Sequence, residues 1–198
     1  MQLIKSVFGR VILRLAGWRI EAPSIQKIES YILIMAPHTS NWDFVIGRLA
    51  LWAIRIEASF LIKKEAFVFP IGQIARAMGG IPVDRVHSGN IIVEIAQLIK
   101  SRKIKVVTIT PEGTRSLRHE WKRGFYHIAR VAAVPIVMAY LDYGKKVAGV
   151  GGVIHPSGNF NDDLKKIYSF YKDKTALHPE KFNLSPQNIM NDPLGRQL

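Results

Sequence analysis

Residues 1–18 show the periodicity of an amphipathic helix. Apolar side chains recur at helical spacing and share one face, namely Met1, Ile4, Val7, Phe8, Val11, Ile12, Leu15 and Trp18. Lys5, Arg10 and Arg14 lie outside this face, two leucines are exceptions, and Gly17 is a suitable stop. The pattern fits two arrangements: a helix lying in a lipid interface with its apolar face down, or a helix packed on its own domain.

The rest of the chain alternates between short apolar runs, which predict strands, and longer amphipathic segments, which predict helices. Strands are expected at 31–36, 58–63, 81–84, 104–110, 135–141 and 146–154, and helices at 41–55, 70–78, 89–102, 124–132 and 162–172. The run at 104–110 is the clearest strand, because nearly all its residues are β-branched. Strands separated by helices predict an α/β domain with a mostly parallel or mixed central sheet flanked by helices.

The pattern divides the chain into three segments. An amphipathic helix occupies 1–20, one α/β domain occupies 21–174, and a polar tail with three prolines occupies 175–198. One domain suits the length of 198 residues. The longest apolar run, 131–141, is shorter than the roughly 18–20 residues that a membrane-spanning helix needs. We expect neither a membrane span nor a signal peptide.

Composition narrows the class of protein. With 48% hydrophobic residues the chain is too apolar to be disordered, and its net charge is +13. A basic chain of mean hydropathy +0.08 and no membrane span suggests a peripheral protein on an anionic surface, or a protein that binds acidic ligands. Cysteine is absent, which excludes disulfides, thiolate metal sites and a cysteine nucleophile.

The first candidate chemistry follows the strand at 31–36. Pro37 disfavours helix before it and leaves His38 in a loop, while Ser40 and Asp43 have the spacing of a capping box that starts the next helix. A bend between loop and helix can bring His38 against Asp43. The pair then suits a carboxylate that holds one imidazole nitrogen while the other acts as a base. Alternatively, Asp43 is only a helix N-terminal charge and His38 an ordinary loop histidine.

A second group of polar residues follows two other strands. The segment 111–116, Pro-Glu-Gly-Thr-Arg-Ser, permits a tight turn close to a ligand, and Arg115 presents a planar fork that suits phosphate oxygens. Arg85 ends the strand at 81–84, and Lys122 comes shortly after the turn. Each cation alone would be an ordinary surface residue. Several cations at one rim, beside a histidine and an acid, indicate a site for an acidic group.

Together these residues resemble the glycerolipid acyltransferase family, whose best-known members are lysophosphatidic acid acyltransferases. The family's four sequence blocks have counterparts here in the same order: His-x4-Asp at His38 and Asp43, Gly-x-x-x-Asp-Arg at 80–85, Pro-Glu-Gly-Thr-Arg-Ser at 111–116 with Lys-x-Gly at 122–124, and Val-Pro-Ile-Val at 134–137. The chain departs from the usual pattern at Pro37, Thr110 and Met138. The ordered set is far more specific than any one block.

The resemblance implies an O-acyltransferase of phospholipid biosynthesis, bound peripherally at the cytoplasmic face of an anionic membrane. Its donor would be acyl-CoA or acyl carrier protein, and its acceptor the hydroxyl of a lysophospholipid similar to lysophosphatidic acid. His38 would be the base and Asp43 its partner. Substrate-binding roles are implied for Arg85, Glu112, Gly113, Thr114, Arg115 and Lys122. We expect no metal or other cofactor, because the thioester is already activated.

Other hypotheses remain at this point. The acceptor could be a different alcohol without a phosphate. A basic nucleic-acid-binding protein would account for the charge, but the chain lacks a recognition signature and we expect no nucleic-acid partner. A noncatalytic membrane-surface module would account for the N-terminal helix, but it leaves the intact pair of His38 and Asp43 without a purpose.

Overall fold

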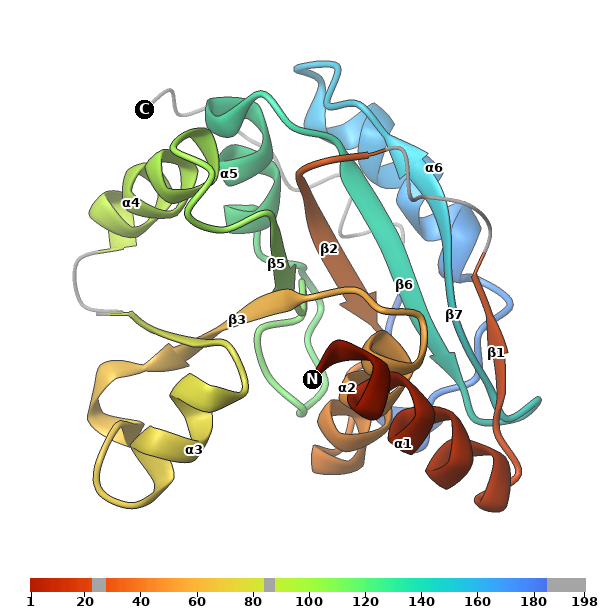
Figure 1. The fold of residues 1–198 in the computed structure, drawn as a ribbon. Coiled ribbons are helices and arrows are strands. Elements are labelled where there is room, and N and C mark those ends of the chain that lie inside the picture. The colour runs from red at the N-terminus through yellow and green to blue at the C-terminus, as the bar shows by residue number, and fades with distance from the viewer. Residues whose placement is uncertain (23–27, 84–87, 185–198) are drawn as a thin grey trace.

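A single mixed sheet organises the chain (Figure 1). The computed structural model describes residues 1–22, 28–83 and 88–184. In this part of the chain seven strands run in the order β1-β7-β6-β2-β5-β3-β4. Their bounds are Arg19–Glu21 (β1), Tyr31–Ala36 (β2), Ala58–Lys63 (β3), Gly80–Val83 (β4), Val106–Ile109 (β5), Ile136–Asp142 (β6) and Val147–Ile154 (β7). All neighbours are parallel except β6 and β7, which confirms the predicted mixed sheet.

The helices lie close to their predicted positions. They are α1 (Gln2–Leu15), α2 (Asn41–Ala53), α3 (Ile71–Ala77), α4 (Ser88–Lys100), α5 (Gly124–Ala132) and α6 (Phe160–Tyr171), with short 3-10 turns at Lys64–Ala66 and Pro179–Lys181. Strand β1 was not predicted, because three residues are too few to show an alternating pattern. These residues form a strand because they pair with β7 at the edge of the sheet. No helix of the described segments is long and apolar enough to cross a bilayer.

The alternation of side chains along β2 separates two layers of core. Ile32 and Ile34 face the side of the sheet covered by α4, α5 and α6. Leu33 and Met35 face the opposite side, where α2 packs. Because β2 lies centrally and both faces are covered, every residue of this strand is buried, as expected for a parallel strand between helical layers.

Helix α1 packs on α2 through its small residues. A Cβ on Gly9 would lie 2.5 Å from the carbonyl oxygen of Leu49, so only glycine allows this approach, and the Ser6 hydroxyl donates to the Ala53 carbonyl. The large apolar side chains of the predicted face therefore stay exposed, among them Ile4 at 73% and Leu15 at 81%. Trp18 is the exception to the prediction: it is buried, because the chain turns after α1 and carries its ring into the domain.

The beginning of the predicted tail belongs to the packed domain. Ala176 is buried, and the ring of Phe182 lies beside that of Trp121 with centroids 6.5 Å apart. The amide of His178 donates to the Thr39 hydroxyl, next to the segment that carries His38. Residues 175–184 therefore form an irregular segment that packs on the domain. The predicted tail beyond it lies outside the described residues.

Candidate active site

The candidate site lies where three neighbouring parallel strands end. Strand β2 pairs with β5 on one side and β6 on the other, both in parallel, so their carboxyl ends meet at one edge. His38 follows β2, Glu112 follows β5, and Tyr143 follows β6 directly. In open α/β sheets this edge is where ligands bind. Topology therefore brings together side chains that are more than seventy residues apart along the chain.

His38 and Asp43 face each other, as the spacing predicted. His38 Nδ1 lies 3.3 Å from Asp43 Oδ2, and the half-buried imidazole covers a buried carboxylate. The capping box is also present: Ser40 caps α2, and its amide donates to the same Asp43 oxygen at 2.8 Å. The Asp43 carboxylate therefore both caps the helix and contacts the imidazole, and its part in catalysis stays a prediction.

Asp43 is held as an anion by its hydrogen bonds. Burial opposes ionisation of this carboxyl, but hydrogen bonds from His38, the Tyr143 hydroxyl and the amides of Ser40 and Thr39 outweigh it and lower the pKa of Asp43. The shortest contacts are the Thr39 amide to Oδ2 and the Tyr143 hydroxyl to Oδ1, each at 2.6 Å. A carboxylate in this state can stabilise a protonated imidazole beside it.

Glu112 is buried against the backbone of His38 and does not lie at the surface. Its Oε1 accepts a hydrogen bond from the His38 amide at 2.9 Å, and the side chain is only 5% exposed. Burial raises the pKa of Glu112 to about 8, with a smaller contribution from the charge of Asp43. The geometry makes Glu112 a support for the loop that carries His38. The substrate-binding role that the family resemblance implied for Glu112 stays a prediction.

The turn at Gly113 and the Lys122 side chain fit each other closely. Gly113 has φ +65°, and a Cβ there would lie 2.8 Å from Lys122 Cδ and 3.3 Å from its Nζ. The Lys122 amide also donates to the Pro111 carbonyl at 2.8 Å, which joins the two segments. Glycine at this position therefore allows the lysine side chain to lie across the turn, beside the buried Glu112.

The remaining predicted binding residues have different surroundings. The Arg115 guanidinium is exposed and donates to the Asn41 side chain at the start of α2, which places it beside the His38 segment. The Thr114 hydroxyl accepts from the Ser116 amide at 3.3 Å, so it shapes the turn. Arg85 lies outside the described residues.

Tyr143 is the member of the site that sequence analysis missed. It lies in no recognised motif, and a tyrosine after an apolar strand is unremarkable on its own. The available signal was its position, because it follows directly after a predicted strand, as His38 and Glu112 nearly do. That signal becomes useful only when β6 is known to be the neighbour of β2.

Comparison with protein families identifies the class of protein to which this site belongs. The family model described as Acyltransferase matches residues 19–141, which contain His38, Asp43, Glu112 and Arg115. The chain belongs to the acyltransferase family. This confirms the class that the four sequence blocks predicted.

The fold of this acyltransferase has a counterpart of known structure. It is similar to the crystal structure of the 1-acyl-sn-glycerophosphate (LPA) acyltransferase PlsC from Thermotoga maritima, with a TM-score of 0.59 and 15% sequence identity. The similarity covers 88% of this chain and 81% of that chain. At this identity the similarity establishes a shared fold. Among curated proteins, none matches the chain.

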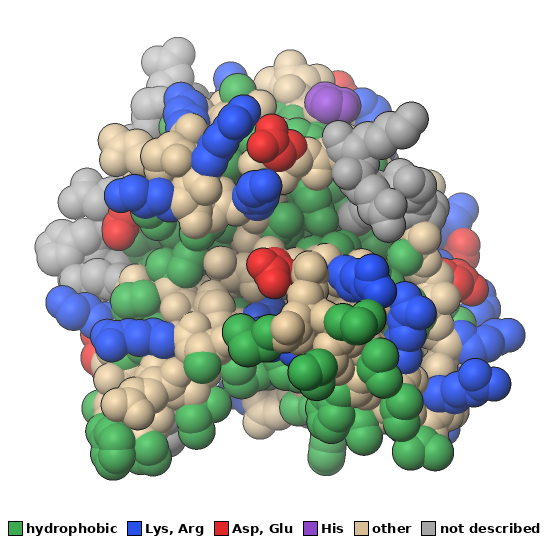
Figure 2. Space-filling view, viewed as in Figure 1, with side chains coloured by type: hydrophobic (Ala, Val, Ile, Leu, Met, Phe, Trp, Pro, Cys, Tyr) green, Lys and Arg blue, Asp and Glu red, His purple; other side chains and the backbone are tan. Residues whose placement is uncertain are grey.

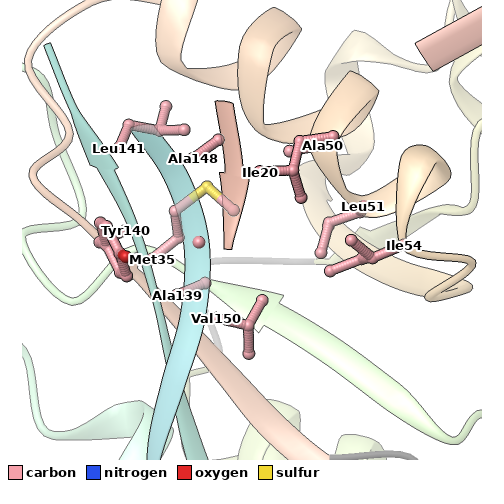
Figure 3. Close-up of a pocket in the computed structure, with 11 residues that line it drawn as sticks. Ile20, Met35, Ala50, Leu51, Ile54, Ala139, Tyr140, Leu141, Ala148 and Val150 are labelled. Carbon is pink, nitrogen blue, oxygen red and sulfur yellow. The ribbon is translucent and has the colours of Figure 1, made fainter. Parts of the chain in front are cut away.

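The acyltransferase also contains a small apolar cavity between α2 and the sheet (Figure 3). Its walls include Met35 of β2, Leu51 of α2 and Val150 of β7. The cavity volume is about 10 Å³, which is room for one water molecule and far too little for an acyl chain. Two aromatic side chains of α2 lie away from this cavity: Trp42 is 62% exposed, and Phe44 packs edge-on against Phe60 with ring centroids 4.9 Å apart.

Proposed function

We propose that this acyltransferase transfers a fatty acyl group from acyl-CoA or acyl carrier protein to the hydroxyl of a lysophospholipid of the lysophosphatidic acid type. The observation that supports this most directly is the contact between His38 and Asp43 at the strand ends. Arg115 and Lys122 lie on the loops beside the pair, and both side chains are exposed to a ligand.

The geometry of the pair supports direct transfer without an acyl-enzyme. Because Nδ1 of His38 faces Asp43, Nε2 is the nitrogen that is free to act as a base. Nε2 takes the proton from the acceptor hydroxyl, and the oxygen attacks the thioester carbonyl carbon to form the new C–O bond. The tetrahedral adduct then expels the sulfur, which recovers the proton from the imidazolium. The ester and the free thiol leave as products, and Asp43 remains ionised throughout.

Cationic side chains near the pair support a phosphate-bearing acceptor. The guanidinium of Arg115 offers parallel donors that match phosphate oxygens, and its bond to Asn41 keeps it at the start of α2. Lys122 adds a point charge over the turn at Gly113. Charge-assisted contacts of this kind contribute about 1.5–3 kcal/mol each. A phosphate monoester held here would have its glycerol hydroxyl within reach of the imidazole.

The exposed face of α1 supports a peripheral position on an anionic lipid surface. Figure 2 shows hydrophobic side chains gathered over α1 and α2, with Lys and Arg side chains beside them. Val7, Phe8 and Val11 are each about half exposed. An apolar strip flanked by cations matches the acyl region and the headgroups of such a surface. We propose that α1 binds the protein to the lipid surface, so that the site takes its lipid acceptor from that surface.

The decisive experiment measures thiol release from acyl-CoA and from acyl carrier protein donors, with and without acceptor. We expect release only when lysophosphatidic acid is present, and a decrease of about 10²–10⁴-fold in kcat for His38→Ala. His155→Ala is the matched control at an exposed histidine of another segment, and it should retain full activity. Wild-type turnover by the His38 variant contradicts the mechanism. Equal turnover of monoacylglycerol, which lacks the phosphate, contradicts the assigned acceptor.

A further inference from the structure

We propose that Tyr143 is a positioning residue of the acyl-transfer site, whose hydroxyl holds the Asp43 carboxylate in the orientation that His38 requires. This inference rests on the proposed function for its kinetic consequence. The Tyr143 hydroxyl donates to Asp43 Oδ1 at 2.6 Å. Tyr143 lies beyond the matched segment 19–141 and in none of the four sequence blocks.

The two oxygens of Asp43 have different kinds of partner. Oδ2 receives the amides of Thr39 and Ser40 and faces His38, so all these contacts come from the segment that immediately precedes Asp43. Tyr143 binds Oδ1 from another element, at the end of β6. A carboxylate held through one oxygen can still rotate about its last side-chain bond, whereas a bond to each oxygen fixes its plane. Tyr143 therefore ties the local cap of α2 to the sheet.

The ring of Tyr143 is itself held in place. The indole of Trp18 packs edge-on against it, with centroids 5.0 Å apart and an interplanar angle of 86°. The amide of Tyr143 donates to the Thr175 carbonyl at 2.9 Å, and that of Trp18 to the Leu13 carbonyl at 2.8 Å. Burial, reinforced by the hydrogen bond to Asp43, raises the pKa of Tyr143, so its hydroxyl keeps the proton that it donates. A continuous set of contacts thus joins the end of α1 to the catalytic pair.

Removing the hydroxyl has two consequences that a purely structural defect would not combine. The carboxylate loses its fixed plane, which lowers kcat. It also loses a donor that shares its negative charge, so it stabilises the imidazolium more strongly and the acid limb of the pH profile moves to higher pH. The other groups facing the pair are Glu112 behind the His38 amide, Arg115 on Asn41, and His178, whose amide binds Thr39. All of them are retained in Tyr143→Phe.

The test compares Tyr143→Phe with Tyr126→Phe. Tyr126 is a matched control because its buried hydroxyl also donates to a buried carboxylate, that of Asp163, at 2.8 Å on α5 and α6. We expect Tyr143→Phe to lose about tenfold in kcat at unchanged KM, as expected for a hydrogen bond to a charged group, with its acid limb shifted to higher pH. Tyr126→Phe should lower thermal stability and leave kcat and the pH profile unchanged. Tyr143→Phe with wild-type kcat and pH profile would overturn the proposal.

A second measurement separates this inference from the proposed function. Proton NMR follows the titration of the His38 ring in the absence of any substrate. The midpoint should move to higher pH in Tyr143→Phe, even if the wild type transfers no acyl group to lysophosphatidic acid. An unmoved midpoint in a folded variant refutes the role of Tyr143. Trp18→Leu keeps the hydroxyl but removes the ring contact that holds it, so it should lower kcat and move the midpoint in the same direction as Tyr143→Phe, but by less. A larger shift than that of Tyr143→Phe would contradict the role assigned to Trp18.

Discussion

Replacing Glu112 by glutamine tests the protonation state that burial imposes on this side chain. Burial in the protein raises the pKa of Glu112 from its ordinary 4.5 to about 8, against the hydrogen bond from the His38 amide, which acts in the opposite direction. The carboxyl is therefore mostly protonated at neutral pH and ionises only at a cost to the folded state. Glutamine has the same shape, keeps an oxygen for the His38 amide, and does not titrate.

The sign and size of the effect follow from these values. Because the folded pKa is raised, the stability that Glu112 contributes is complete below pH 4.5 and is lost as the pH rises through about 8. Each pH unit between the two values corresponds to about 1.4 kcal/mol. The free energy of unfolding of the wild type should therefore fall, relative to Glu112→Gln, by about 3 kcal/mol up to pH 7 and about 4 kcal/mol up to pH 8, where the carboxyl is half ionised in the folded state.

The assay is urea unfolding of both proteins at a series of pH values from 4.5 to 8.5. Only the difference between them is used, so that all other titrating groups cancel. Glu94→Gln, at an exposed position of α4, is the matched control and should differ from the wild type by the same amount at every pH. A difference between wild type and Glu112→Gln that stays constant from pH 4.5 to 8.5 would refute a buried, protonated Glu112.

Three further predictions concern the binding turn, the cation and the N-terminal helix. Gly113→Ala should raise the acceptor KM, because its Cβ displaces the flexible end of Lys122, and should destabilise the fold by roughly the 1–2 kcal/mol of a left-handed residue. The control is Gly158→Ala, which is also at positive φ but has open space around it. In denaturant unfolding it should lose only the free energy that the left-handed backbone costs an alanine. Arg115→Ala should raise the acceptor KM about tenfold or more with little change in donor KM, whereas Arg130→Ala on α5 should change neither. The double variant Val7→Ser and Val11→Ser should bind less to sedimented anionic phospholipid vesicles, while the same changes at the equally exposed Val93 and Val131 should leave binding intact. Undiminished binding by the first pair would show that α1 is not the docking surface.

The spacing of apolar residues predicted most of the helices and strands, because it shows which residues close in sequence lie on the same face of a helix or strand. Strand β2 was predicted with its observed bounds, and α2 begins after Ser40 as the capping box indicated. The spacing of His38 and Asp43 allowed their contact without requiring it, because the loop and the first turn of α2 are consecutive in the chain. The order of the four blocks then predicted the acyltransferase class, which the family comparison confirms.

Two features of α1 could not follow from periodicity. The helical pattern placed Trp18 on the same face as Ile4 and Leu15, which are exposed, but the chain turns after Leu15 and buries the Trp18 ring against Tyr143. The pattern also left open which face packs on the domain. Packing chose the face that contains Gly9, because the closest approach of two helix backbones needs a position without a side chain. A hydrophobic pattern is defined by large apolar residues, so it does not reveal a packing face made of small residues.

The sequence by itself determined the acyltransferase class, the α/β alternation, and the pair that comes from one short segment. Only the tertiary structure decided that Glu112 binds the backbone of the His38 loop, that Tyr143 binds Asp43, and that residues 175–184 pack against the site. The physical reason is strand order. Which strand ends lie beside β2 depends on how distant segments pack into one sheet, and the spacing of residues along the chain does not contain that information.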